Sequence, residues 1–220
     1  MQTGSYLNAG ESVESLSKDF SELLESGLNH DAEIKCGEHT VKIHKNILCA
    51  RSEVFRAMLE SDMLEGLSGV IEIHDTDITY LQDFIRYLYT GTLPELTFDK
   101  AKELYELGEK YLVKSLVSRC SEYLQDNLSD ENACQCLALA EVHSDDKLKE
   151  TAIAYTLEKK IYLQDKIWLP FCNHCPKLAY EVYTILQESG NLKKKVMPTC
   201  DTKEPDVKMT VLKKCKQTSA

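Results

Sequence analysis

The hydrophobic pattern of this chain changes early from strand spacing to helix spacing, and this change limits its possible folds. Alternating apolar residues predict two strands, Ala32–Cys36 and Val41–Ile43, joined by a turn at Gly37-Glu38. A third short strand is predicted at Val70–Ile73. The rest of the folded part repeats its apolar residues at helical spacing. The sequence therefore predicts an α+β domain with a small sheet flanked by helices, followed by an all-helical part.

The expected helices share an amphipathic pattern, and several have recognisable ends. Gly91 is expected to close one helix in the left-handed conformation. Ser129 and Ser144 are expected to cap the starts of two later helices, because acidic residues follow each of them. We expect helices over residues 16–26, 44–50, 52–60, 78–88, 97–107, 113–126, 130–142, 145–159, 165–172 and 176–188.

Composition divides the chain into four segments. We expect a flexible start over residues 1–15, an α+β domain over 16–124, a helical extension over 125–190 and a basic flexible tail over 191–220. From Lys193 onward, eight lysines against three acidic residues give a charge of +5. The total charge is −10, so the remainder of the chain carries −15.

An acidic body argues against a dedicated nucleic-acid partner, because such binding depends on neutralising phosphates. The sequence has no apolar stretch near the length that a membrane span requires, and its start carries no signal-peptide pattern. We expect neither a nucleic-acid partner nor a membrane partner.

Nine cysteines are scattered through the chain. An odd number of them in amphipathic segments favours free thiols in a reducing compartment, so we expect a location in the nucleus, the cytoplasm or both. Cys172 and Cys175 have a spacing that can chelate zinc, but a structural site needs four ligands and no second suitable pair is present. We therefore expect no metal.

The sequence offers little for catalysis. Residues 66–69 are too short for a phosphate-binding loop and lack its lysine, and no serine lies in a nucleophile-elbow pattern. His44 and Cys49 lack an orienting third group and are more simply structural. We expect a protein that is not an enzyme and binds no cofactor.

Several short motifs follow one another along the first domain: Asp31, His44-Lys45 with Leu48, Ala50-Arg51-Ser52 with Phe55, Tyr89-Thr90-Gly91 and Lys110-Tyr111. In this order and spacing they resemble a BTB/POZ domain over about residues 16–124. A departure is Gly108, where the family usually has alanine; glycine there should weaken its helix slightly without threatening the fold.

The downstream part has a second pattern, which runs through residues 127–133 and 140–149 and continues with Trp168, Pro176 and Tyr183. This pattern is similar to the BACK-like helical segment of the speckle-type POZ protein family. It implies self-association of the helical extension through Tyr183. In that family an amino-terminal MATH domain binds substrates. Only about fifteen residues precede the first expected helix here, so we expect this chain to lack such a domain.

The resemblance implies an adaptor that binds cullin-3 through an apolar residue, any residue and then glutamate. Met58-Leu59-Glu60 and Met63-Leu64-Glu65 both fit, and the second is favoured because the family places this motif after a helix. A flexible methionine can fill an apolar groove on a partner. Alternatively, Met63 covers the core and Glu65 is merely solvated. Tyr89 is either an edge contact to cullin-3 or a packing residue.

The resemblance also implies a homodimer. Leu16, Phe20, Leu23 and Ile47 match apolar interface positions of the speckle-type POZ protein family. Asp31 and Arg51 form either a charged pocket near that interface or an ordinary intrachain ion pair.

Two functions remain open. The first is a dimeric adaptor that links unknown substrate proteins to a cullin-RING ubiquitin ligase. The alternative is a MATH-less regulator that pairs with full-length relatives without recruiting substrate itself.

Overall fold

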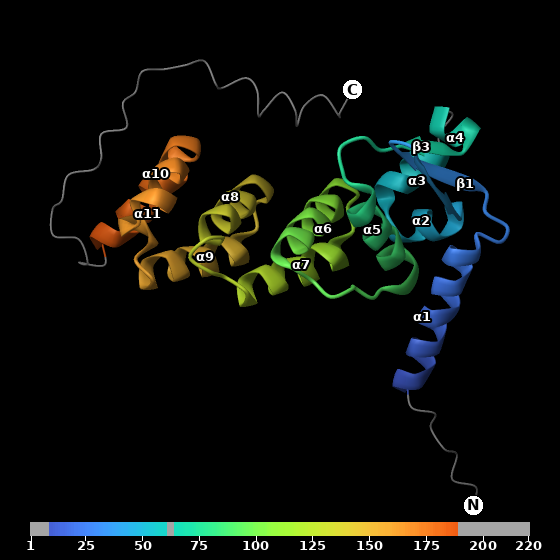
Figure 1. Ribbon diagram of the computed structural model, residues 1–220, viewed down its shortest axis with the longest axis horizontal. Helices are drawn as coiled ribbons and strands as arrows, with labels where there is room; N and C mark the ends of the chain where they lie inside the picture. Colours follow the sequence, from blue (N-terminus) through green and yellow to red (C-terminus); the bar gives the residue numbers. More distant parts are fainter. Residues whose placement is uncertain (1–8, 61–63, 189–220) are drawn as a thin grey trace, which may run out of the picture. The chain divides into compact units, whose positions relative to one another are not determined.

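The computed structural model describes residues 9–60 and 64–188, except for the side chains of residues 9–12 and 64. The chain divides into two compact units, Met1–Ala152 and Ile153–Ala220. Figure 1 shows the order of their elements by colour. The first unit holds the sheet and most of the helices, and each unit is described by itself below.

The sheet has three strands in the order β2-β1-β3: β1 (Ala32–Cys36), β2 (His39–Ile43) and β3 (Val70–Glu72). β1 runs antiparallel to β2 and parallel to β3, so Ile34 lies opposite Val41 on one side and Ile71 on the other. Ile34 and Ile71 are buried. Gly37 has a φ of 56°, which fits the expected turn. The three predicted strands are confirmed.

The helices of the first unit occur where helical spacing was found, with two differences. α1 begins at Ala9 rather than near residue 16, and a one-turn helix, α4, was not expected. The helices are α1 (Ala9–Ser26), α2 (Lys45–Arg51), α3 (Glu53–Glu60), α4 (Leu64–Ser68), α5 (Ile78–Thr90), α6 (Phe98–Lys110), α7 (Lys114–Asp126), α8 (Ala133–His143) and α9 (Asp146–Glu158), the last of which crosses into the second unit.

Three aromatic rings meet in the core of the first unit. The rings of Phe55 in α3 and Tyr111 after α6 are stacked, with centroids 4.4 Å apart and planes 14° apart. Phe84 in α5 lies 5.4 Å from the Tyr111 ring. All three side chains are almost fully buried. Rings of this size contribute a large share of the buried apolar area, so they join three helices tightly.

Buried Ser52 connects two of these segments, the start of α3 and Tyr111, through hydrogen bonds. Its hydroxyl donates to the carbonyl of Tyr111 at 2.7 Å and accepts from the backbone N–H of Phe55 at 3.1 Å. The second bond caps the start of α3. The Arg51-Ser52 and Lys110-Tyr111 motifs are therefore side by side because one hydroxyl bonds both segments.

Gly108 is required by close helix packing. A Cβ at this position would lie 2.9 Å from Cγ2 of Val117 on α7. Glycine thus lets α6 and α7 approach each other more closely than alanine would, which offsets its lower helix propensity.

The expected serine caps at Ser129 and Ser144 are wrong. Ser144 has a φ of 56° and ends α8, while the carboxylate of Asp145 accepts from the N–H of Leu148 at 3.0 Å and so caps α9. α8 begins only after Asn132, whose side chain accepts from the N–H of Ser129 at 2.8 Å. A carboxylate is the better acceptor at a helix start because it also carries charge.

The second unit continues with a short 3-10 helix, η1 (Ile161–Leu163), and two helices, α10 (Asp165–His174) and α11 (Pro176–Glu188). The buried Trp168 ring packs on Phe171, with centroids 5.0 Å apart. Its indole N–H donates to the Tyr183 hydroxyl at 3.2 Å. The predicted fold class, a small sheet with helices followed by an all-helical part, is confirmed.

We predict that Ser52→Ala lowers the free energy of unfolding by about 2 kcal/mol, because it removes a helix cap and leaves a buried carbonyl unsatisfied. Urea denaturation followed by circular dichroism measures this change. Ser118→Ala on the exposed side of α7 is the matched control and should change stability little. Equal stability of the two variants would contradict the role given to Ser52.

Candidate protein-interaction surfaces

The expected cullin-binding triplet lies at the start of α4. Met63 is outside the described residues, and Leu64 is the first residue of α4, with its side chain outside the description. Glu65 is half-buried in the first turn. The assignment of these three residues to a cullin contact stays a prediction.

α4 presents an apolar side chain that the sequence analysis missed. Leu67 is 76% exposed. The helix is held in place by the Gly69 N–H, which donates to the Glu65 carbonyl at 2.9 Å, and by Lys45, whose Nζ donates to the Gly66 carbonyl at 3.4 Å. A leucine between two glycines could have been noticed in the sequence, but a segment this short has no periodicity to separate an exposed from a buried position.

Tyr89 is only 6% exposed, so it can offer a partner little area. Its hydroxyl lies 2.8 Å from both the backbone nitrogen and Nδ1 of His44, and Nε2 of that ring lies 2.7 Å from the Leu28 carbonyl. Burial raises the pKa of Tyr89 to about 12, so its hydroxyl stays neutral at physiological pH. The hydroxyl therefore links α5 to the start of α2, and the His44 ring in turn contacts the segment that follows α1.

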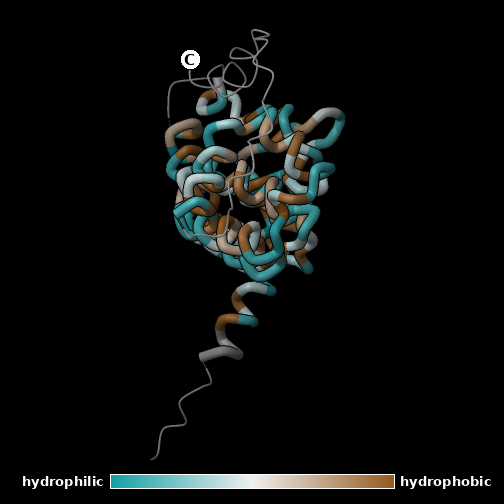
Figure 2. The backbone as a smooth tube through the Cα atoms, turned by 90° about the vertical axis from the view of Figure 1, so that its left-hand side faces the viewer, coloured by the Kyte–Doolittle hydropathy of each residue, from teal (hydrophilic) through white to brown (hydrophobic). Residues whose placement is uncertain are grey.

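α1 carries an apolar stripe that its own unit leaves partly uncovered. Val13 and Leu16 are 66% and 56% exposed, whereas Phe20 and Leu23 are half-buried. The first turns of α1 stand away from the other elements of this unit in Figure 1. Hydrophobic and hydrophilic residues alternate along them in Figure 2. An exposed apolar stripe of this kind is typical of a surface that contacts another protein.

The remaining residues expected near that interface are only partly brought together. Ile47 is half-buried on α2. A carboxylate oxygen of Asp31 accepts from the backbone N–H of Lys45 at 2.8 Å, while the Arg51 guanidinium lies 5.8 Å from the centre of the Tyr87 ring. Within the described ranges no ion pair joins Asp31 to Arg51, so each is held by a different contact.

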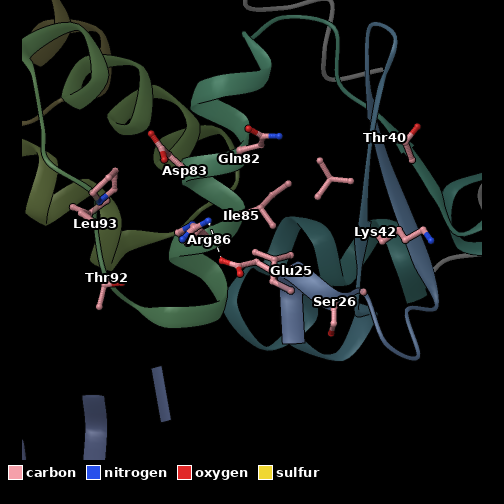
Figure 3. Close-up of a pocket in the computed structure, with 14 residues that line it drawn as sticks. Glu25, Ser26, Thr40, Lys42, Gln82, Asp83, Ile85, Arg86, Thr92 and Leu93 are labelled. Carbon is pink, nitrogen blue, oxygen red and sulfur yellow. Dashed lines mark ion pairs between the residues drawn. The ribbon is translucent and has the colours of Figure 1, made fainter. Parts of the chain in front are cut away.

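A groove that no sequence pattern indicated lies between α1, β2, α5 and residues 92–94. Its volume is about 890 Å³. Figure 3 shows Thr40 and Lys42 on the β2 side, and Ile85 and Arg86 on the α5 side. An ion pair of 3.4 Å between Glu25 and Arg86 ties α1 to α5 beside the groove. The groove forms only when segments distant in sequence come together.

Comparison with known proteins identifies the family. A model of the BTB/POZ domain matches residues 20–128. The chain belongs to the BTB/POZ domain family. Domains of this family commonly mediate dimerisation and the binding of partner proteins.

Matches to individual relatives are longer than the BTB/POZ domain. TD and POZ domain-containing protein 4 of Mus musculus is 33% identical over 173 residues, 76% of this chain and 46% of the relative. BTB/POZ domain-containing protein At4g08455 of Arabidopsis thaliana is 31% identical over 204 residues, 81% and 83% of the two chains. Protein maternal effect lethal 26 of Caenorhabditis elegans is 33% identical over 149 residues, 67% and 38%.

This BTB/POZ chain spans about half the length of the mouse TD and POZ relatives, 46% and 49% for two of them. The relatives support the BTB/POZ family as a whole. The narrower resemblance to the speckle-type POZ protein family, and the expected lack of a MATH domain, stay predictions.

Two buried cysteines have perturbed thiols. Burial raises the pKa of the Cys120 and Cys136 thiols to about 12, which keeps them protonated and unreactive. In the described part of the chain, no group of three or more histidine, cysteine or acidic side chains could hold a metal ion, and no helix has the length and apolar character of a membrane span.

Tyr183, expected in self-association, is half-buried and accepts the hydrogen bond from Trp168.

We predict that Tyr89→Phe lowers the free energy of unfolding by about 1–3 kcal/mol, because the His44 groups lose the hydroxyl that they share. Thermal and urea denaturation measure the loss. Tyr80→Phe, also on α5 and half-buried, is the control, since its hydroxyl has no hydrogen bond within the described residues. A Tyr89→Phe protein as stable as Tyr80→Phe would show that this hydroxyl does not hold the unit together.

Proposed function

We propose that this BTB/POZ protein is a dimeric adaptor that binds cullin-3 and links partner proteins to a cullin-RING ubiquitin ligase. The observation that carries the proposal is the exposed helix α4, which begins within the Met63-Leu64-Glu65 triplet and presents Leu67 to solvent. In this proposal the protein supplies binding surfaces and no catalytic group. A nuclear or cytoplasmic location, where its thiols stay reduced, is part of the same proposal.

The chemistry of α4 and its start suits a helical or grooved partner surface. Met63 can adapt its shape to an apolar pocket. Glu65 provides a carboxylate that accepts hydrogen bonds from partner N–H groups. Leu67 adds apolar area, and the bond from Lys45 to Gly66 fixes the position of the helix before a partner binds. A surface that is already in place loses less entropy on binding than a flexible loop.

The α1 stripe supports the dimer. A second copy can cover Val13 and Leu16 with its own α1, because an isologous interface places the same patch of both subunits face to face. Half-buried Phe20 and Leu23 continue the stripe toward the core. Each copy thus completes the burial of apolar side chains that neither can bury alone.

The same stripe also suits a mixed dimer with a related BTB protein. A relative with a matching α1 would cover Val13 and Leu16 as well as a second copy does. Native mass spectrometry of this protein co-expressed with a mouse TD and POZ relative distinguishes the homodimer from the mixed dimer. Detection of a mixed species supports this second function. A spectrum that contains only homomeric species excludes it.

We predict that the Met63→Ala, Glu65→Ala double variant binds the amino-terminal domain of cullin-3 at least about tenfold more weakly than the unmodified protein. Biolayer interferometry with immobilised cullin-3 measures the affinity. Glu60→Ala, which changes the glutamate of the other triplet on the exposed side of α3, is the matched control and should bind normally.

Two outcomes would overturn the cullin-3 contact at α4. One is equal binding by the double variant and the unmodified protein. The other is equal weakening by Glu60→Ala, which would indicate a general charge effect instead of a contact at this helix.

We predict that Leu16→Asp shifts the dimer to monomer, raising the dissociation constant at least about tenfold, because the interface would bury an unpaired carboxylate. Sedimentation velocity over a concentration series measures the shift. Ser15→Asp adds the same charge at an exposed position about 100° around α1 from Leu16 and should leave the dimer intact. An unchanged dimer in Leu16→Asp would place the interface elsewhere.

A further inference from the structure

β2 is an edge strand whose outer backbone groups face away from the sheet. On β1, the Glu33 N–H donates to the Gly69 carbonyl and the Lys35 carbonyl accepts from the Ile73 N–H, each at 2.8 Å. These two residues of β1 therefore direct their backbone groups toward β3. Alternate residues of a strand point to opposite sides, so Ile34 and its neighbours two positions away bond β2.

The register then determines which backbone N–H and C=O groups of β2 form no hydrogen bond with β1. Val41 lies opposite Ile34 and is bonded to β1. Thr40 and Lys42, one position to either side, direct their N–H and C=O groups outward. No fourth strand follows β2 in the described sheet. Two residues thus offer four backbone hydrogen-bonding groups along one edge.

Residues of this edge line the groove of Figure 3. Thr40, Val41 and Lys42 line it on the β2 side, and α5 with residues 92–94 lies across from them. Because the groove has a wall on each side, it suits a single extended segment better than the edge of another sheet.

We propose that this groove binds an extended peptide segment of a partner protein, which adds to β2 as a fourth strand. The segment has apolar side chains at alternate positions, with acidic side chains between them. Backbone groups of Thr40 and Lys42 supply its hydrogen bonds, as in other cases of strand addition. This site is separate from α4 and does not depend on cullin-3 binding.

The two faces of the sheet determine the alternation. The side chain of Val41 shares its face with buried Ile34, so a residue added beside it points to that same face. The groove lining includes the apolar residues Leu24 and Leu93. A peptide residue with this orientation needs an apolar side chain.

The opposite face favours acidic residues. Thr40 and Lys42 are exposed on it, and Lys35 is exposed beside Thr40 on β1. Lys42 lies opposite Glu33, yet no ion pair involving Lys42 is found in the part of the chain that the structure describes. A carboxylate on the added strand would therefore meet a lysine with no carboxylate partner.

Lys42 also restricts which strands can pair. A lysine on an edge strand discourages unselective pairing with uncharged strands. Here it would favour acidic segments and reject basic ones, so the same residue protects the edge and selects its partner.

Fluorescence polarisation with a fluorescein-labelled nine-residue peptide that alternates valine and glutamate tests the proposal on the full chain. We expect saturable binding, and binding roughly tenfold weaker for Thr40→Pro. Proline removes one outward N–H while leaving the ladder to β1 unchanged, which edge strands tolerate. Thr40→Val keeps the N–H and should bind the probe normally. Lys42→Glu should prefer a probe in which lysine replaces glutamate.

Hydrogen exchange gives a second readout. The amides of Thr40 and Lys42 should exchange quickly in the free protein and slow down with the probe, whereas the Val41 amide is protected in both states. Equal probe binding by Thr40→Pro and Thr40→Val, or no binding to the unmodified protein, overturns the proposal. Amides of Thr40 and Lys42 that are already protected in the free chain would show that this chain or a second copy fills the groove, which also overturns it.

Discussion

The stacked rings of Phe55 and Tyr111, with the Ser52 hydroxyl that bonds Tyr111 from 59 residues away, join distant segments of the chain, and the first unit depends on these contacts. The sheet has only three short strands and cannot bury a core by itself. Phe84 adds the long helix α5 to the same cluster. Tyr89 then extends from that helix to His44 and fixes the start of α2. The positions of α4 and of the β2 edge follow from these contacts, because both are attached to the elements that the cluster holds.

A small core of this kind leaves backbone and apolar groups without cover, and these are the surfaces proposed for binding. The stripe at Val13 and Leu16 extends past the elements that could bury it. Leu67 lies on a helix too short to turn every apolar side chain inward. The edge of β2 stays open because the sheet ends there. Each of these surfaces is exposed for a different physical reason. The three surfaces therefore suit three different kinds of partner.

Sequence periodicity predicted the strands, most helices and the fold class, because spacing alone shows which residues share a face. It failed where one side chain competes with its neighbour. Asp145 caps α9 instead of Ser144, since a carboxylate next to the helix start is the stronger acceptor. The sequence predicted only that Gly108 weakens its helix slightly. In the structure, Val117 on α7 packs so close to Gly108 that a larger residue would not fit. For Tyr89, the motif left packing and partner contact equally open, and the hydrogen bonds to His44 favour packing.

The sequence by itself determined the BTB/POZ resemblance, the faces of α1 and the triplet at residues 63–65, because these depend on residue types at fixed spacing. The tertiary structure decided which apolar residues stay uncovered, as with Leu16 and Leu67, because cover comes from elements distant in the chain. It also decided that Thr40 and Lys42 turn their backbone groups outward, since this direction depends on how β1 pairs with β3. Spacing specifies a face, whereas only packing specifies what lies against it.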